Sequence, residues 1–95
     1  MSKKKQTFKG TVYVAVTDDC TSSQIVYERV CFVICKNFPN LQITKLDLYD
    51  LDDALKADEL GIFDAPCIVY NNEKLQGLVS EEVILKFLKD CMSDD

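Results

Sequence analysis

Hydrophobic and polar positions follow two different periods along this chain, and the changes of period mark its elements. Residues 11–17 are almost continuously apolar and rich in β-branched side chains, which predicts a central strand covered on both faces. From residue 22 to residue 37 the pattern becomes helical, although the inner run 30–35 would also suit a strand. The predicted buried face of this helix consists of Val26, Val30, Val33 and Ile34, with Tyr27 and Phe38 at its apolar edge. Phe32 is an apolar outlier on the polar side.

The second half of the chain predicts five more elements. Residues 41–48 form a second strand, parallel to the first because a crossover helix separates them, and residues 50–60 form a short helix that Gly61 ends. Residues 67–70 and 73–77 form a hairpin around Asn71-Asn72, which tolerate the positive φ angles of a tight turn. Ser80 caps a last helix, whose expected apolar side is Val83, Ile84, Phe87, Leu88 and Cys91.

This order, β-α-β-α-β-β-α, predicts an α/β fold: a three-layer sandwich around a four-stranded mixed sheet. We expect one domain over residues 1–95, with residues 1–7 as a disordered tail that contains the basic cluster Lys3-Lys4-Lys5. In α/β sheets the chemistry gathers at the carboxyl ends of the strands, where the loop at Asp18-Asp19-Cys20 emerges.

Composition narrows the function classes. The net charge of −5 argues against nucleic acid and anionic membranes as partners. No apolar run approaches the roughly 18 residues of a membrane span, and no signal segment follows the N-terminal lysines, so we expect a cytoplasmic protein. The five irregularly spaced cysteines predict free thiols rather than a disulfide framework. The chain has no His, which excludes Ser/His and Cys/His catalysis and most zinc chemistry.

The candidate chemistry lies in Asp18-Asp19-Cys20-Thr21-Ser22-Ser23. A thiol in the first turn of a helix meets unpaired backbone N–H groups, which favour the thiolate, and Ser23 could donate a further hydrogen bond. Asp18 and Asp19 act in the opposite direction, because a nearby carboxylate disfavours a second negative charge. The sequence leaves the sign of the pKa shift open, and with it the choice between a reactive thiol and a simple strand end and helix cap.

Three segments resemble the thioredoxin-like superfamily. Residues 44–48, Thr-Lys-Leu-Asp-Leu, are similar to its second parallel strand, and residues 57–67 are similar to its short helix, Gly-Ile turn and signature proline. Residues 71–77 are similar to its terminal hairpin. The resemblance covers about residues 11–90 and is nearest to the compact, glutaredoxin-sized members. It implies that Pro66 follows a cis peptide bond and lies beside the active cysteine.

What the resemblance implies for the site is an active Cys20 polarised by Ser23. A substrate groove would be shaped by Asp19, Thr21, Ala65 and Pro66. The dithiol motif of the family is reduced here to Cys-x-x-Ser, so a dithiol reductase is excluded. Monothiol glutaredoxins share Cys-x-x-Ser but also carry a nearby Lys and a Gly-Gly pair, and here Gly77 is followed by Leu78-Val79. We therefore expect no cofactor, neither glutathione nor an iron–sulfur cluster.

The other thiols have weaker claims. Cys67 is the candidate resolving thiol because it follows the signature proline, but a strand residue there could equally be a small core side chain, which we favour. Cys31 and Cys35 share a helical face and predict semi-buried structural thiols, since no His or Cys-x-x-Cys completes a metal site. Cys91 is expected in the core.

Two functions remain, beside a weaker third option in which a dimer bridges an iron–sulfur cluster through Cys20 of each chain. The first is a monothiol thiol–disulfide exchange protein acting through Cys20 on a protein thiol or disulfide. The second is a degenerate, non-catalytic module of the same fold that binds a protein partner, favoured by the missing second Cys, by Asp19 and by Phe32. For either function we expect a monomer.

Overall fold

The computed structural model describes residues 10–92. Its strands are β1 (Thr11–Val16), β2 (Gln42–Asp47), β3 (Cys67–Tyr70) and β4 (Glu73–Gln76). Its helices are α1 (Thr21–Asn37), α2 (Leu51–Glu59) and α3 (Glu81–Met92). The element order is the predicted one, with ends that differ by at most one residue. The expected tail, residues 1–7, lies outside the described residues.

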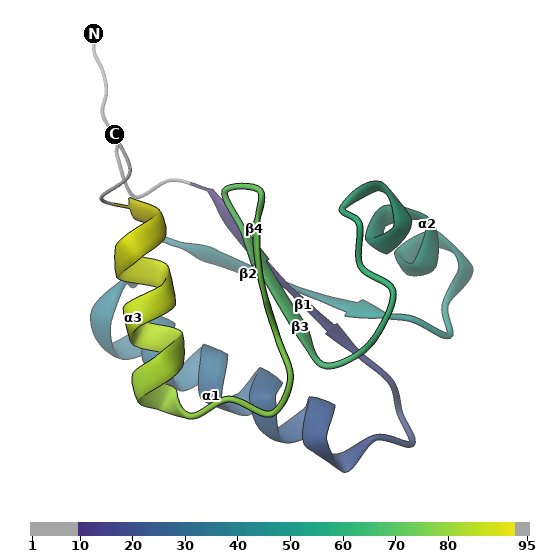
Figure 1. Cartoon of the computed structure of the whole chain (residues 1–95), viewed down its shortest axis with the longest axis horizontal. Helices are drawn as coiled ribbons and strands as arrows, with labels where there is room; N and C mark the ends of the chain where they lie inside the picture. Colours follow the sequence, from purple (N-terminus) through teal and green to yellow (C-terminus); the bar gives the residue numbers. More distant parts are fainter. Residues whose placement is uncertain (1–9, 93–95) are drawn as a thin grey trace, which may run out of the picture.

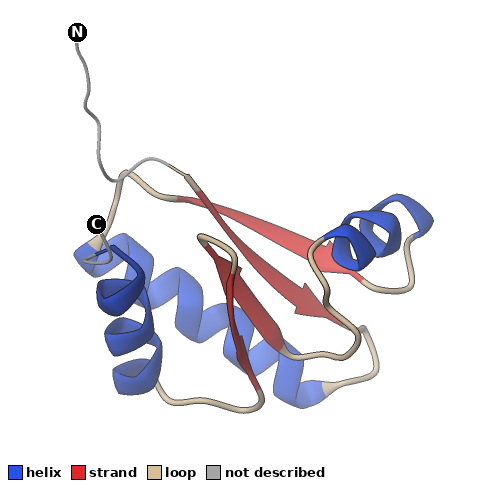
Figure 2. Cartoon of the chain, turned by 45° about the horizontal axis from the view of Figure 1, so that its top comes forward, coloured by secondary structure: helices blue, strands red, loops and turns tan. Residues whose placement is uncertain are grey.

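The four strands form one mixed sheet in the order β2-β1-β3-β4 (Figure 1). β1 pairs with β2 in parallel, as the crossover helix requires, and β3 is antiparallel to both β1 and β4. The β3–β4 turn places Asn71 and Asn72 at φ angles of 52° and 67°, as their side chains allow. Helices α1 and α3 cover one face of the sheet and α2 covers the other, which confirms the three-layer α/β fold (Figure 2).

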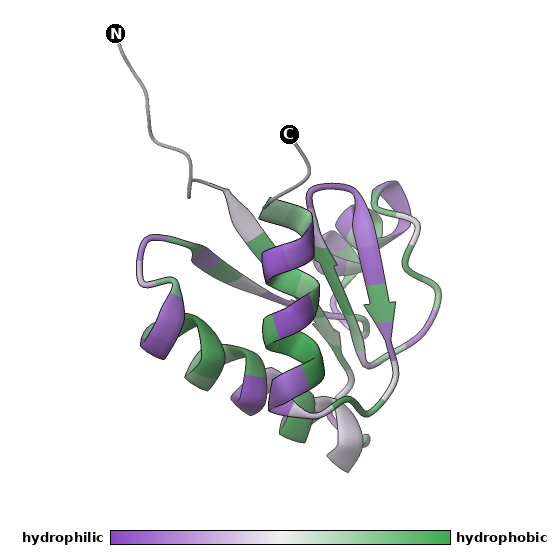
Figure 3. Cartoon of the chain, turned by 60° about the vertical axis from the view of Figure 1, so that its left-hand side comes forward, coloured by the Kyte–Doolittle hydropathy of each residue, from purple (hydrophilic) through white to green (hydrophobic). Residues whose placement is uncertain are grey.

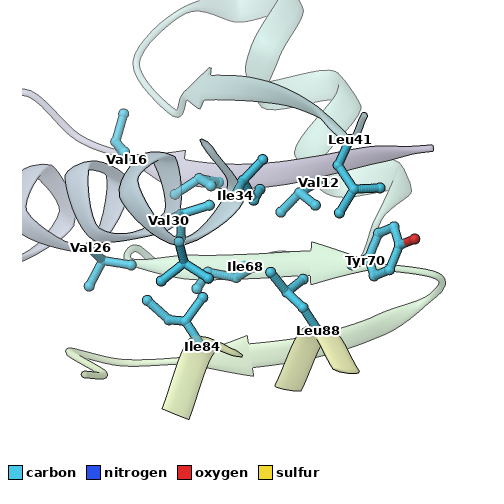
Figure 4. Packing of buried hydrophobic residues seen from close by; sticks show 12 residues of the cluster. Val12, Val16, Val26, Val30, Ile34, Leu41, Ile68, Tyr70, Ile84 and Leu88 are labelled. Carbon is cyan, nitrogen blue, oxygen red and sulfur yellow. The ribbon is translucent and has the colours of Figure 1, made fainter. Parts of the chain in front are cut away.

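The main core lies between the sheet and the pair α1 and α3. The predicted face of α1 is buried there, and Tyr27 and Phe38 pack at its edge. Figure 4 shows side chains of β1, β3 and α3 meeting those of α1 around Ile68. The members of this core are Val12, Val14, Val16, Val26, Val30, Val33, Ile34, Leu41, Ile68, Tyr70, Ile84 and Leu88.

Helix α3 is amphipathic, as its sequence predicts. Bands of hydrophilic and hydrophobic residues alternate along it in Figure 3. Its charged side chains lie outside, while Ile84 and Leu88 are buried. One expected core position is wrong: Val83 is 44% exposed, because it lies in the first turn, where Ser80 accepts the Val83 N–H as the helix cap.

A smaller core lies under α2 and determines the fate of several site residues. Along β1 the side chains alternate, so Val14 and Val16 face α1 while Ala15 faces α2. Ala15 packs there with Ala57 of α2 and Cys67 of β3. Asp50 caps α2 by accepting the N–H of Asp53 at 3.1 Å. None of the helices within residues 10–92 has the length and apolar character to cross a membrane.

Candidate functional site

Cys20 lies at the junction between β1 and α1. The strand ends at Val16, and the chain turns over residues 17–20, with the N–H of Cys20 donating to the carbonyl of Thr17 at 3.1 Å. Cys20 is the N-cap of α1, with φ −112° and ψ 103°, and not a residue of its first turn as expected. The N–H groups of Ser23 and Gln24 donate to the Cys20 carbonyl, so Cys20 is the first acceptor of the helix and the helix itself begins at Thr21.

Ser23 holds this junction together. Its side chain is completely buried, and its Oγ accepts the N–H of Thr17 at 3.1 Å. The same hydroxyl lies 2.8 Å from the Cys20 carbonyl and 3.1 Å from the Thr17 carbonyl, and its one proton donates to the nearer. The Gln24 amide also donates to Thr17, at 3.1 Å. A buried hydroxyl therefore joins the end of the strand to the start of the helix.

Hydrogen bonds lower the pKa of the Cys20 thiol. The backbone N–H of Ser23 contributes most, followed by the Ser23 hydroxyl, and the Thr17 hydroxyl and the Ser22 N–H add to it. Partial burial acts in the opposite direction. Because the Ser23 hydroxyl donates its one proton to the Cys20 carbonyl, the N–H groups at the start of α1 are the main cause. The sign of the shift, which the sequence left open, is downward.

Asp19 has a hydrogen-bond partner other than the thiol. Both of its carboxylate oxygens lie 3.0 Å from the phenolic oxygen of Tyr49, which follows the end of β2 and donates its proton to them. This contact is the first cause of the raised pKa of Tyr49, with Asp18 and Asp47 adding smaller repulsions. Sequence reasoning missed Tyr49, and it placed Thr17 at the end of the strand without a role at the thiol. The usable signal was their position directly after the two parallel strands.

Ala65 and Pro66 lie at the end of the sheet where β1 leads into the Cys20 loop. Ala15 pairs with Cys67, so the preceding Pro66 lies beside the end of β1, and the peptide bond between Ala65 and Pro66 is cis. The Pro66 carbonyl accepts the N–H of Gly77 at 3.0 Å, which ties the end of β4 to this edge. Pro66 is buried, whereas Ala65 is half-buried and Thr21 is exposed on the helix start. The expected groove residues thus come from three segments around one edge.

Cys67 lies in the smaller core. It is 2% exposed, and it packs with Ala15, Leu46 and Ala57 on the α2 side of the sheet. Burial raises the pKa of its thiol, which keeps it protonated and unreactive. Helix α1 covers the opposite face. The favoured interpretation of Cys67 as a core residue therefore agrees with its packing.

The remaining cysteines lie on α1 and α3. Cys31 is half-buried. A hydrogen bond with the Cys31 side chain is the first cause of the raised pKa of Tyr27. Cys35 is exposed, so the expectation of two semi-buried thiols is wrong for this one: the helix continues past the edge of the covered face. Cys91 is half-buried and packs against the main core. Within the described part of the chain, no three Cys, Asp or Glu side chains gather as a metal-binding set.

Comparisons with known proteins bear on the fold. No protein-family model and no curated protein sequence matches the chain. Among solved structures, a single-site mutant of a thioredoxin from Halobacterium salinarum is similar, with a TM-score of 0.68 and 18% identity over 86% of this chain and 74% of that one. A structure described as that of a malarial protein is similar with a TM-score of 0.68 and 14% identity over 84% of this chain and 93% of that one. At such identities the likeness concerns the fold, and this chain has a thioredoxin-like fold.

Proposed function

We propose that this protein carries out thiol–disulfide exchange with a protein partner in the cytoplasm, through the single thiol of Cys20. The observation that supports it is the position of this thiol at the N-cap of α1, where backbone N–H groups lower its pKa. A thiolate is the attacking species in such exchange. Cys20 is half-buried, which leaves the sulfur open to a second molecule.

The exchange step is a substitution at sulfur. The Cys20 thiolate attacks one sulfur of a partner disulfide, a new Sγ–S bond forms, and the partner's S–S bond breaks. The second partner sulfur leaves as a thiolate and takes a proton from water. The number of disulfides is unchanged, so the step needs no cofactor and no outside oxidant. Its product is a mixed disulfide between Cys20 and the partner.

Release of the partner requires a second thiol from outside this chain. Ser23, where a dithiol motif has its second Cys, offers only a buried hydroxyl. Cys67 is buried on the α2 side of the sheet, and its raised pKa disfavours attack. In the proposal a small-molecule thiol, or a second thiol of the partner, attacks the mixed disulfide and restores Cys20.

The groove residues would bind the polypeptide around the partner's sulfur. Ala65, which precedes the cis bond to Pro66, is half-buried at the end of the sheet where Cys20 lies. Thr21 is exposed on the first turn of α1, and Asp19 is exposed beside the thiol. Ser23 acts on the sulfur through its N–H more than through its hydroxyl. In this proposal the protein acts as a monomer.

The pH dependence of Cys20 alkylation tests the proposal. Iodoacetamide is added over a pH series, and modification of each cysteine is followed by peptide mass spectrometry. We expect Cys20 to react with an apparent pKa below the ordinary value of about 8.5, and Cys20→Ser to remove this fast phase. A Cys20 that reacts no faster than a model peptide thiol would refute the exchange function.

The second candidate function is that of a non-catalytic module, in which this same fold serves only to bind a protein partner. Its support is the exposure of large apolar side chains, above all Phe63, which is 84% exposed. Under this candidate, Cys20→Ser keeps full partner binding and no mixed disulfide appears on non-reducing gels. Under thiol exchange, the mixed disulfide forms with the native protein and is lost with Cys20→Ser.

A further inference from the structure

Large apolar side chains are exposed unevenly over the molecule. Within residues 10–92, four of the seven that are exposed lie between residues 49 and 63. We call them the α2 outer face: Tyr49 at 66% exposure, Leu51 at 74%, Leu55 at 58% and Phe63 at 84%. Leu51 and Leu55 are four residues apart on α2 and therefore lie on one side of the helix.

This side of α2 has no covering element among the described residues. The opposite side packs on the sheet, where Ala57 is buried against Ala15 and Leu46. In Figure 2, α2 stands on its own side of the sheet, away from α1 and α3. Tyr49 and Phe63 flank the helix before its start and after its end. A short helix thus buries its small residues and leaves its leucines to solvent.

The surroundings of the α2 outer face are acidic. The carboxylates on and beside α2 are Asp47, Asp50, Asp52, Asp53, Asp58, Glu59 and Asp64. The single lysine of α2, Lys56, lies 5.3 Å from the centroid of the Tyr13 ring of β1 and 3.8 Å from Glu59, so it is drawn toward the sheet. Lys74 of β4 reaches the far end, donating to the Gly61 carbonyl at 2.9 Å. Carboxylates therefore dominate the rim of the apolar side chains.

The α2 outer face also adjoins the candidate site. Leu48 donates its N–H to the carbonyl of Val16 at 3.0 Å, and Tyr49 bonds to Asp19, the residue before Cys20. A partner bound along α2 would therefore reach the Cys20 loop at the N-terminal end of the helix. By contrast Phe32, 52% exposed on α1, has a lysine over its ring at 5.5 Å.

From the exposed leucines and their acidic rim, we propose that the α2 outer face is the docking surface for a cationic, amphipathic segment of a partner protein. Apolar side chains of that segment would cover Leu51 and Leu55, and its Lys or Arg side chains would meet the surrounding carboxylates. Such charge complementarity mainly raises the association rate and selects the partner. A second copy of this chain is a poor occupant, because the same carboxylates would face each other. That the bound segment is held for reaction with Cys20 is the one part that rests on the proposed function.

A pair of short designed helical peptides tests the proposal. Both carry the same leucines on one face, and the other positions are Lys in one peptide and Glu in the other. Binding of each is measured by fluorescence anisotropy, and the binding site is mapped by amide chemical shifts of the labelled protein. We expect the Lys peptide to bind, the shifts to concentrate in residues 47–64, and the Glu peptide not to bind. Affinity should fall at least about tenfold between ~0.05 M and ~0.5 M salt, since screening weakens exposed charge pairs.

Matched variants distinguish binding at the α2 outer face from binding through charge alone. Leu51→Asn combined with Leu55→Asn should lower the affinity for the Lys peptide by about tenfold. Phe32→Ser on α1 should leave that affinity unchanged. Equal affinity of both variants, or shifts that lie on α1 and α3, would overturn the docking surface. So would concentration-dependent shifts in residues 47–64 without peptide, which would indicate a second copy as occupant. Cys20→Ser should bind the Lys peptide normally, so a failed thiol exchange and a failed docking surface give different results.

Discussion

The phenolic oxygen of Tyr49 lies 3.0 Å from both carboxylate oxygens of Asp19, and this contact joins the turn after β2 to the loop that carries Cys20. The two residues are far apart in the sequence, and the parallel pairing of β1 with β2 brings them to one edge. The contact gives the carboxylate next to Cys20 a partner other than the thiol. The reactivity of Cys20 and the titration of Tyr49 should both depend on it.

Removing the Tyr49 hydroxyl should make Cys20 less reactive. In Tyr49→Phe the Asp19 carboxylate loses its donor and can approach the thiolate. One unit charge brought from far away to ~6 Å in water would slow alkylation at neutral pH by roughly threefold, which is the upper limit of the effect because Asp19 is already next to Cys20. The alkylation rate over a pH series measures this. Adding Asp19→Asn to Tyr49→Phe should restore the rate, and a double variant as slow as Tyr49→Phe alone would contradict the explanation.

The same contact predicts how Tyr49 titrates. Asp19 raises the pKa of Tyr49, so the phenol should ionise above its ordinary range, as followed by ultraviolet absorbance. A folded-state pKa above the unfolded value contributes stability that is present below the unfolded pKa and is lost as pH rises through the folded pKa. Asp19→Asn should return the midpoint toward the ordinary value. A midpoint that Asp19→Asn leaves unchanged would contradict the assignment.

Loss of the Ser23 hydroxyl should destabilise the fold and raise the pKa of Cys20. Ser23→Ala leaves the N–H of Thr17 without its acceptor beside a fully buried position, which costs about 1–3 kcal/mol in the free energy of unfolding. Urea denaturation measures this cost. Ser22→Ala is the matched control and should stay within about 0.5 kcal/mol, because the Ser22 N–H that acts on Cys20 is kept.

The alkylation profile of Ser23→Ala should shift to higher pH, since its hydroxyl is one cause of the lowered pKa of Cys20. A folded-state pKa below the unfolded value contributes stability that is present above the unfolded pKa and is lost as pH falls through the folded pKa. The part of this stability due to the Ser23 hydroxyl should vanish in the variant. An unchanged profile would contradict a role for the Ser23 hydroxyl and leave the N–H groups of α1 and the Thr17 hydroxyl as the causes.

The cysteines should differ sharply in accessibility. A disulfide reagent added to the native protein should modify Cys20 and the exposed Cys35 within the fast phase, and Cys67 only after unfolding, because Cys67 is 2% exposed. Counting modified residues by mass spectrometry, with and without urea, gives the comparison. Cys35→Ser assigns the second fast thiol. A disulfide between Cys20 and Cys67 in oxidised native protein would show that the buried thiol can resolve Cys20.

Stability should depend on the main core and not on the exposed aromatic of the α2–β3 loop. Ile68 is fully buried between α1, α3 and the sheet, and Ile68→Ala should cost about 2–5 kcal/mol in the free energy of unfolding. Phe63, 84% exposed, should change stability by no more than about 0.5 kcal/mol when replaced by Ala. Thermal and urea unfolding of both variants provide the test. A large loss with Phe63→Ala would show that Phe63 is covered in the folded protein.

The elements and the fold class could be predicted from the amino-acid sequence, because they follow from local period and turn chemistry. The spacing of Val26, Val30 and Ile34 defined the buried face of α1, and Asn71-Asn72 set the hairpin. The thioredoxin-like order was readable because each segment carried its own signal. Cys20 was identified from its place where the period changes. These properties depend on neighbours along the chain.

The electrostatics around the thiol could not be predicted from local patterns and depend on the folded arrangement. The direction of the Cys20 pKa shift depends on where the Ser23 and Ser22 N–H groups point. It also depends on which group donates a hydrogen bond to the Asp19 carboxylate. The burial of Cys67 depends on the pleat of β3 against Ala15. Charge interactions and sheet faces are set by distances between segments remote in sequence, and a one-residue difference reverses them. For that reason Tyr49, which no local pattern singled out, became visible only when β2 lay beside β1.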